Sequence, residues 1–314
     1  MESERLGPFR LVPWFSSRPW GRRDLRPWYG AEAFAGTAEP VGEAWLTGPE
    51  SLVETGPMVG RTLAAVAAES GEALLGAGGG AEFPLLVKLL FPNDKLSVQV
   101  HPDDGHAQAM GQPRGKTECW YVLEAEPGAT IALGLKPGAT KEAVRSAIEA
   151  GTLEEWMEWV PVAVGDMVFV DAGTVHAIGP GVVLLETHQT CDVTYRMYDY
   201  GRPRELHVEQ ALKVMRAETA AGKVQPKQMD GFVRLIEQKY FVVDRYDVAA
   251  GGELVVPTRG AGCLVGLWGV AAVIGGPQGQ VELLPGKAVV VPAECPSVIV
   301  ETGSEVSFVK CWAP

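Results

Sequence analysis

Polar side chains alternate with apolar ones in the segment LSVQVHPDD, which begins at residue 96. Successive side chains of an extended strand point to opposite faces, so the leucine and the two valines would face a core. Ser97, Gln99 and His101 would then share the other face. An amide oxygen and an imidazole nitrogen on one strand face are possible ligands for a divalent metal ion, which needs several donors that converge on one point.

Two more segments supply groups of the same kind. Lys116 and Glu118 alternate along the strand-like run GKTECWYVLEA, and His176 lies at the turn after the run GDMVFVDAG. With Gln99 and His101 these residues give two imidazoles, one carboxylate and one amide. Such a set suits zinc or another first-row divalent ion and leaves room for water or a substrate. Each histidine alone could be a hydrogen-bonded core residue, but the combination of four donors favours a metal site.

A further group of polar residues lies in the segment ETHQTCDVTYRMYDYGR, residues 186–202. Asp192, Thr194 and Arg196 alternate there and would share one strand face. Charged groups inside a protein are unfavourable unless they pair with each other or bind a ligand. The pattern alone leaves two interpretations open, a structural ion pair at the rim of a barrel or part of a ligand site.

The segments that would position these residues are short and rich in Val, Leu and aromatic residues. The 38 glycines and 23 prolines are scattered between them, which is typical of many short strands joined by turns. Helical spacing of apolar residues occurs in three places, residues 62–76, 140–156 and 205–217, and Thr140 is in position to cap the second. We therefore predict a mainly β fold with a few short helices.

Two segments resemble each other and the second signature of the cupin fold, G-x5-P-x-G-x2-H. GDMVFVDAGTVHAI has both glycines and the histidine, His176, whereas GKAVVVPAECPSVIV has Ser297 in the histidine position. We predict two cupin-type (jelly-roll) β-barrels, the second without a metal ligand. The polar stretch AETAAGKVQPKQMDG would separate an N-terminal catalytic metal-binding cupin domain with helical elements, residues 1–225, from a C-terminal degenerate cupin domain, residues 226–314.

The composition excludes several kinds of partner. The chain has 314 residues, of which 46% are apolar and 21% charged, and its net charge is −12. An acidic chain of this kind is not expected to bind nucleic acid or an anionic membrane, since both attract cationic surfaces. The five cysteines include no C-x-x-C, and the first residues, MESERLGPFR, carry charges where a signal peptide needs an apolar run. These features favour a reducing, cytoplasmic location.

Four segments in a fixed order resemble the type I phosphomannose isomerases in their compact bacterial form: LSVQVHPDD, GKTECWYVL, AGTVHAIGPGVVLLE and CDVTYRMYDYGR. The early segments PWFSSRPWGRRDL and VGEAWLTG are similar to the N-terminal region of the same family. Recognisable motifs run from Pro13 to the helix expected at 205–217, and the C-terminal barrel fits by architecture. The resemblance implies a zinc-dependent aldose–ketose isomerase, with one Zn²⁺ per chain, that interconverts mannose 6-phosphate and fructose 6-phosphate by proton transfer between C1 and C2.

The resemblance also implies roles for individual residues. The family's metal ligands fall on the set reached above from donor chemistry: Gln99, His101, Glu118 and His176. Its catalytic residues fall on Arg196, Glu186 and Lys116, and its substrate-binding residues on Ser97, Lys88 and Arg202. Glu186 or Lys116 would be the acid/base, and Arg196 would either bind phosphate or polarise the C1 and C2 oxygens. His188 departs from the family pattern, in which glutamine is expected.

Two other functions would use similar residues. A cupin oxidoreductase that contains iron would also use two histidines and one carboxylate, but the glutamine ligand and the nearby lysines and arginines argue against it. A non-catalytic sugar-phosphate-binding cupin is expected to lack Glu186 or Arg196, and both are present. In the favoured interpretation the partner is a small-molecule sugar phosphate, with no nucleic acid and no membrane, and the chain is a monomer or a homodimer.

Overall fold

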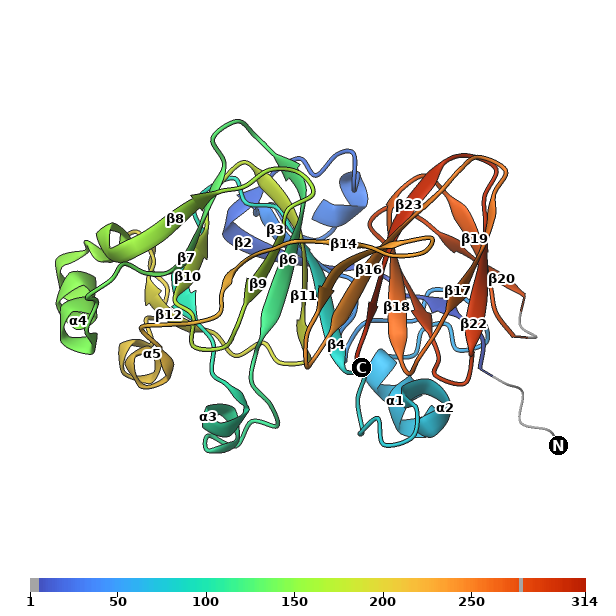
Figure 1. The fold of residues 1–314 in the computed structure, drawn as a ribbon, viewed down its shortest axis with the longest axis horizontal. Coiled ribbons are helices and arrows are strands. Elements are labelled where there is room, and N and C mark those ends of the chain that lie inside the picture. The colour runs from blue at the N-terminus through green and yellow to red at the C-terminus, as the bar shows by residue number, and fades with distance from the viewer. Residues whose placement is uncertain (1–5, 277–278) are drawn as a thin grey trace.

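The computed structural model describes residues 6–276 and 279–314, and these residues are mainly β, as predicted. Their strands form four antiparallel sheets, arranged as two pairs (Figure 1). The helices are few and short, and none in the described residues has the length and apolar character needed to cross a membrane.

The first pair of sheets carries the predicted site residues. Its seven-stranded sheet has the order β13-β9-β6-β11-β4-β3-β2, and its five-stranded sheet has the order β12-β5-β10-β7-β8. The strands of the larger sheet are β2 (Trp14–Arg22), β3 (Val41–Trp45), β4 (Leu85–Leu90), β6 (Glu118–Ala125), β9 (Met167–Val170), β11 (Val182–Gln189) and β13 (Gly222–Val224). Those of the smaller sheet are β5 (Val98–Val100), β7 (Thr130–Leu135), β8 (Met157–Pro161), β10 (His176–Ile178) and β12 (Tyr195–Tyr198).

The second pair of sheets consists mainly of the last part of the chain. Its seven-stranded sheet has the order β1-β21-β18-β23-β16-β15-β14, and its four-stranded sheet has the order β17-β22-β19-β20. The strands of the larger sheet are β1 (Phe9–Arg10), β14 (Lys227–Gln228), β15 (Val233–Glu237), β16 (Val242–Val248), β18 (Gly262–Trp268), β21 (Ala288–Val291) and β23 (Val306–Trp312). Those of the smaller sheet are β17 (Glu253–Pro257), β19 (Ala271–Ile274), β20 (Gln280–Leu283) and β22 (Ser297–Glu301).

The sequence predicted two β-barrels of the jelly-roll type, and in the structure the two sheets of each pair face each other without closing into a barrel. No sheet pairing in residues 6–276 and 279–314 joins one sheet of a pair to the other. Apolar side chains fill the space between them instead, among them Trp120 and Ile178 in the first pair and Phe308 and Val273 in the second. A double sheet is the usual form of a jelly roll, which keeps its sheet edges rather than closing them.

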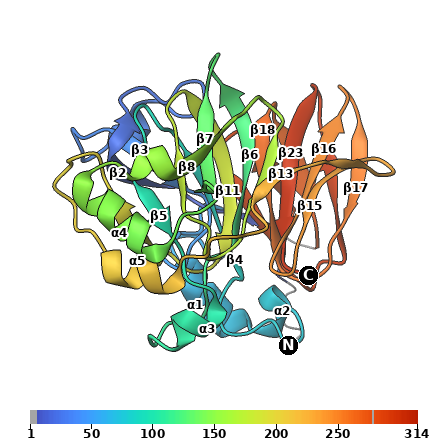
Figure 2. The same cartoon turned by 60° about the vertical axis from the view of Figure 1, so that its left-hand side comes forward.

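The two seven-stranded sheets pack against each other and join the pairs into one body (Figure 2). One apolar cluster contains Leu185 and Val87 from the first pair and Val309 from the second, all of them buried. The hydroxyl of Thr187 and the thiol of Cys311 lie 3.5 Å apart within this contact. The layers therefore follow the order five-, seven-, seven- and four-stranded sheet.

Each of the three segments expected to be helical contains helix. The helices are α1 (Leu63–Ser70) and α2 (Glu72–Leu75) in the first segment, α4 (Lys141–Ala150) in the second and α5 (Val208–Val214) in the third. Thr140 caps α4, as predicted, and the first segment breaks at Gly71, whose φ of 46° interrupts the helix. Outside these three segments lies α3 (Asp104–Gln108), which spans little more than one turn. Short 3₁₀ turns are η1 (Ala31–Phe34) and η2 (Leu153–Trp156).

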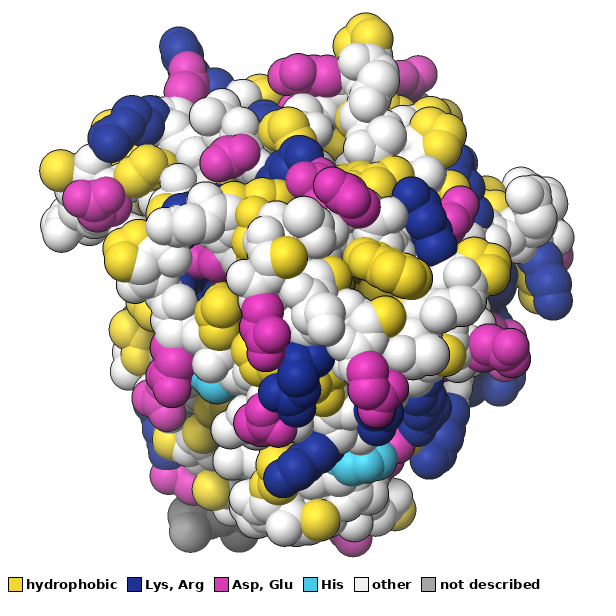
Figure 3. All heavy atoms as spheres, turned by 90° about the vertical axis from the view of Figure 1, so that its left-hand side faces the viewer, with side chains coloured by type: hydrophobic (Ala, Val, Ile, Leu, Met, Phe, Trp, Pro, Cys, Tyr) yellow, Lys and Arg dark blue, Asp and Glu magenta, His cyan; other side chains and the backbone are white. Residues whose placement is uncertain are grey.

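Charges of both signs are interspersed on the face seen when the left-hand side of Figure 1 is turned to the viewer (Figure 3). Ion pairs at the protein surface include Arg145 with Glu209 and Arg216 with Asp103, each at 2.5 Å. Exposed pairs of this kind contribute little to stability. On this face the negative net charge is therefore not gathered into one acidic field.

We expect Leu185→Ala to lower the stability of the whole fold. Leu185 is buried where the seven-stranded sheets meet, and its neighbours across the strands are Leu89 and Tyr121. Removing a buried leucine side chain leaves a cavity and costs about 2–5 kcal/mol. Urea unfolding followed by fluorescence and by circular dichroism should show one cooperative transition at a lower midpoint.

Leu52→Ala, at an exposed leucine, is the control and should change the free energy of unfolding by no more than about 0.5 kcal/mol. Two separate transitions in Leu185→Ala, of which only one has shifted, would contradict a core shared by both pairs of sheets.

Candidate metal centre and active-site pocket

Short segments of facing sheets bring the predicted metal ligands together inside the first pair. Gln99 on β5 and His176 on β10 are opposite each other in the five-stranded sheet, and His101 directly follows β5. Glu118 begins β6 of the facing seven-stranded sheet. Ligand atoms of His101, Glu118 and His176 all lie within 4.8 Å of one another. The amide nitrogen of Gln99 lies 3.3 Å from His176 Nε2, so the four residues are contiguous.

Backbone carbonyls fix the tautomer of both histidines. His101 Nδ1 donates to the carbonyl of Val193, and His176 Nδ1 donates to the carbonyl of Thr174, each at 2.9 Å. The Nε2 atoms therefore present lone pairs, and they lie 3.6 Å and 3.3 Å from the two carboxylate oxygens of Glu118. A histidine held by Nδ1 with Nε2 free is the usual arrangement of a metal ligand.

The burial and charge of this donor set fit a divalent cation. His101 Nε2 and Glu118 Oε1 are buried and have no hydrogen-bond partner within the described part of the chain. Burial lowers the pKa of His176 to about 4 and that of His101 well below its ordinary value, so both imidazoles are neutral near pH 7. Burial also raises the pKa of Glu118 to about 7, although Lys116 opposes this shift. A bound cation would pair with these atoms and favour the ionised carboxylate.

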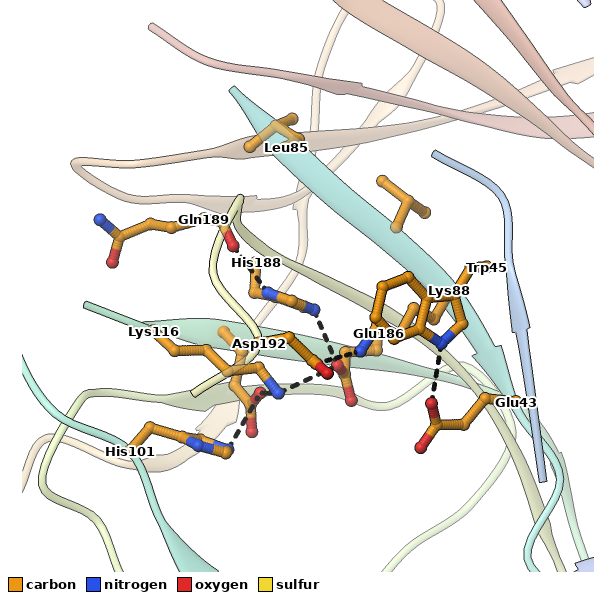
Figure 4. A network of polar contacts seen from close by, with 12 residues as sticks. Glu43, Trp45, Leu85, Lys88, His101, Lys116, Glu186, His188, Gln189 and Asp192 are labelled. Atoms are coloured by element: carbon orange, nitrogen blue, oxygen red, sulfur yellow. Dashed lines mark hydrogen bonds and ion pairs between the residues drawn. The ribbon is translucent and has the colours of Figure 1, made fainter. Parts of the chain in front are cut away.

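A buried network of charged side chains adjoins the donor set, and Figure 4 shows Lys116, Glu186 and His188 within it. Lys116 Nζ lies 3.0 Å from Glu118 Oε2 and 3.3 Å from Glu186 Oε1, and His188 Nε2 lies 3.0 Å from the same Glu186 oxygen. Burial alone would lower the pKa of Lys116, but the carboxylates of Glu118 and Glu186 raise it. Burial would raise the pKa of Glu186, but Lys116 and His188 hold it well below its ordinary value. Lys116 and Glu186 are therefore an ionised pair at neutral pH.

A pocket of about 440 Å³ lies beside this network, and Gln99, Lys116 and Glu186 form part of its wall. Its volume is in the range of pockets that hold small molecules. The other charged residues that line it are Arg18, Glu43, Lys88, Asp192, Arg196 and Arg204. The pocket thus joins the candidate metal centre to a group of cationic side chains.

The pocket contains most of the remaining predicted site residues. Ser97 and Arg196 line it, and Arg196 lies opposite Gln99 across β12 and β5. Lys88 also lines it, with Nζ 2.6 Å from Asp192 Oδ1 and 3.9 Å from the ring centre of Trp45. Asp192 therefore pairs with Lys88, and the ion pair with Arg196 that the strand pattern left open does not form.

Apart from the metal-ligand candidates His101, Glu118 and His176, two other residues considered from the sequence lie outside the pocket wall. Arg202 is paired with Asp199 at 3.0 Å and donates to the carbonyl of Lys95 at 2.7 Å. His188 is fully buried, donates from Nδ1 to the carbonyl of Gln189 at 2.7 Å and packs against the Glu186 carboxylate.

Sequence reasoning did not find Arg18, Glu43 and Arg204 as pocket residues. Arg18 Nε and Nη2 lie 2.9 Å and 3.0 Å from the two oxygens of Glu43. Glu43 could have been found, because it is the one charge in the apolar run VGEAWLTG. Arg204 follows β12 in an irregular segment, where no periodic pattern indicates the direction of a side chain.

Comparison with known proteins finds isomerases of one family. Residues 9–135 match the model of the type I phosphomannose isomerase catalytic domain. The chain is 40% identical over 218 residues to the mannose-6-phosphate isomerase of Streptococcus mutans. The aligned region covers 66% of this chain and 67% of that protein. It is 35% identical over 262 residues to the mannose-6-phosphate isomerase ManA of Bacillus subtilis, covering 79% of this chain and 81% of ManA.

Solved structures agree with these similarities. The crystal structure of the mannose 6-phosphate isomerase from Bacillus subtilis has a TM-score of 0.85 at 27% identity, covering 98% of this chain and 100% of that chain. A variant of the phosphomannose isomerase from Salmonella typhimurium has a TM-score of 0.77 at 16% identity and supports the fold alone. With 35% identity over 81% of ManA, the chain belongs to the type I phosphomannose isomerase family.

Proposed function

We propose that the chain is a zinc-dependent isomerase that interconverts mannose 6-phosphate and fructose 6-phosphate. The observation that carries this proposal is the convergence of His101, Glu118 and His176 within 4.8 Å, beside a pocket lined by Lys116 and Glu186. The relatives named above are mannose-6-phosphate isomerases. A coupled assay that detects fructose 6-phosphate formed from mannose 6-phosphate by the zinc-loaded protein tests the proposal, and absence of turnover with zinc, cobalt and manganese would refute it.

Gln99, His101, Glu118 and His176 would hold one divalent ion. Two imidazoles, one carboxylate and one amide oxygen suit Zn²⁺ and leave a position open for water or substrate. When bound, the ion would supply Lewis-acid stabilisation of negative charge on the C1 and C2 oxygens. The hydrogen bonds from Nδ1 of both histidines to backbone carbonyls would keep Nε2 directed at it.

Glu186 is the better candidate for the base that moves the proton between C1 and C2. Its carboxylate lines the pocket and is held through Oε1 by Lys116, which leaves Oε2 for the substrate. Its lowered pKa keeps it ionised at neutral pH and thus ready to accept the C2 proton, which it would return to C1. The raised pKa of Lys116 keeps that side chain protonated, so we assign it to donating hydrogen bonds to developing oxyanions.

Cationic residues would hold the phosphate group of the substrate. Arg196 lies in the pocket wall, as do Ser97 and Lys88. Lys88 is paired with Asp192 and Arg202 with Asp199, so we propose that these two cations support phosphate binding less strongly than Arg196 does. Guanidinium groups suit phosphate because their planar fork matches two of its oxygens.

We further propose that residues 1–225 form the catalytic domain and residues 226–314 a degenerate cupin domain. In support, β13 ends at Val224 in the seven-stranded sheet of the first pair, and β14 begins at Lys227 in that of the second. The N-terminal strand β1 is the exception: it belongs to residues 1–225 but pairs with β21 of the second pair of sheets.

His176→Ala is expected to lose bound metal and isomerase activity together. The substitution removes one of two neutral imidazoles that face Glu118, and the remaining donors would bind zinc more weakly. Elemental analysis of the purified protein, alongside the coupled assay, measures both. Ser297→Ala is the matched control, since Ser297 occupies the histidine position of the second repeat, and it should keep wild-type zinc content and rate. A metal-free His176→Ala protein with full activity would overturn the ligand assignment.

Glu186→Gln should reduce kcat by about 10²- to 10⁴-fold, the usual contribution of a positioned general base. Zinc content should be unchanged, because Glu186 is not a proposed ligand and Lys116 lies between it and the ligand Glu118. Steady-state kinetics combined with exchange of the C2 hydrogen into solvent measures the proton-transfer step. Wild-type exchange in this variant would exclude Glu186 as the base and return that role to Lys116.

A further inference from the structure

The cations that line the pocket differ in how far their charge is neutralised. Arg18 uses Nε and Nη2 for Glu43, and its Nη1 donates to Ser16 at 2.5 Å and to the carbonyl of Ser17 at 3.2 Å. Lys88 has its ammonium group 2.6 Å from Asp192 Oδ1. Both side chains are therefore already paired with a carboxylate.

Arg196 is not neutralised in this way. Its only side-chain hydrogen bond in the described structure runs from Nη1 to the carbonyl of Glu205, at 2.7 Å, and its buried Nε has no partner there. Burial lowers the pKa of Arg196, and the neighbouring charge of Arg204 lowers it further. An unpaired, partly buried guanidinium group in a pocket wall is unfavourable unless an anion binds to it.

Arg204 is the second guanidinium group with free donors. Its Nε and Nη2 lie 2.6 Å and 2.7 Å from the two oxygens of Asp199, and no described contact uses Nη1. The Asp199 carboxylate is buried and is shared with Arg202, whose Nη2 lies 3.0 Å from Oδ1. Arg202 also lies 3.6 Å from Asp94 Oδ2, so the guanidinium group of this cluster that lacks a carboxylate partner among the described residues is that of Arg196.

We propose that Arg204 and Arg196 together bind the phosphate group of the substrate, and that Asp199 holds Arg204 in place for this role. This inference rests on the proposed function and identifies a phosphate-binding residue, Arg204, that no motif indicated. Both side chains line the same pocket as Glu186 and Lys116, so one sugar phosphate can reach both groups. Guanidinium groups with free N–H donors suit a phosphate dianion, because their planar fork matches two of its oxygens, whereas the ammonium group of Lys88 acts as a point charge.

The assignment also separates the two roles that the sequence left open for Arg196. The charged groups that act on Arg196 are Arg204, Asp199, Arg18 and Arg202. Those that act on Glu186 are Lys116, His188 and Lys88. Because the main electrostatic neighbours of Arg196 are arginines and Asp199, and those of Glu186 are Lys116, His188 and Lys88, we assign Arg196 to the phosphate rather than to the C1 and C2 oxygens.

Isothermal titration of the zinc-loaded protein with inorganic phosphate tests the proposal without requiring turnover. Arg204→Ala should weaken phosphate binding by about 10- to 100-fold, as expected for the loss of charge-assisted hydrogen bonds. Its KM for mannose 6-phosphate should rise by a similar factor while kcat changes less. Arg204→Lys keeps the positive charge beside Asp199 but loses the planar guanidinium fork. It should therefore bind phosphate more tightly than Arg204→Ala but more weakly than the wild-type protein.

Arg145→Ala is the matched control. Arg145 on α4 forms the same two-point pair with Glu209, at 2.5 Å and 3.0 Å, but it is exposed and does not line the pocket. It should bind phosphate as the wild-type protein does. Zinc content and melting temperature, measured for every variant, show that each binding result comes from folded, loaded protein.

The outcomes separate this inference from the proposed isomerase function. Wild-type phosphate affinity in both Arg204→Ala and Arg204→Lys would overturn the phosphate site, even with full isomerase activity in the wild-type protein. Loss of phosphate binding in Arg204→Ala, with no turnover by the wild-type protein, would support the phosphate site and refute the isomerase.

Discussion

Burial of the Glu118 carboxylate is the constraint on which the rest of the site depends. Its side chain is 1% exposed and its oxygens face the lone pairs of two neutral imidazoles, His101 and His176, at 3.6 Å and 3.3 Å. An ionised carboxylate in these surroundings needs cations beside it, and Lys116 supplies one at 3.0 Å. Because Glu118 and the histidines come from facing sheets, the site exists only while the distance between those sheets is held fixed.

The second pair of sheets helps to hold that distance, although Ser297 stands in its repeat where the first repeat has His176. Its seven-stranded sheet packs against the outer face of β6 and β11, whose inner face carries the site. Hydrogen bonds add to this support. The Tyr240 hydroxyl donates to Asp104 at 2.6 Å, and the Gln189 amide donates to Asp104 at 3.0 Å. The Gln189 side-chain oxygen accepts the N–H of Thr117, the residue before Glu118, at 3.1 Å.

The parts of this molecule that obey local rules could be predicted from the sequence. Alternation along two strands placed Gln99 and Glu118 on inward faces, and a short turn signature marked His176, so the donor set could be assembled before any fold was known. Barrel closure could not be predicted, because it depends on which edge strands pair across the sheets. The position of the Arg204 side chain could not be predicted either. It is set by the ion pair with Asp199, and this pair forms only when an irregular segment folds onto the pocket.

A chain with a net charge of −12 can still bind a dianion because electrostatic interactions are local. At physiological ionic strength the Debye length is about 8 Å, so acidic groups on distant surfaces act only weakly on the pocket. Within the pocket, the guanidinium group of Arg196 has no carboxylate partner among the described residues, while the Lys116–Glu186 pair adjoins Glu118 of the candidate metal centre. This separation would give an open-chain sugar phosphate one favoured direction, phosphate toward the arginines and C1 and C2 toward Glu186. Such orientation is fixed by the fold before substrate arrives, and preorganised charge of this kind needs no rearrangement when the proton moves.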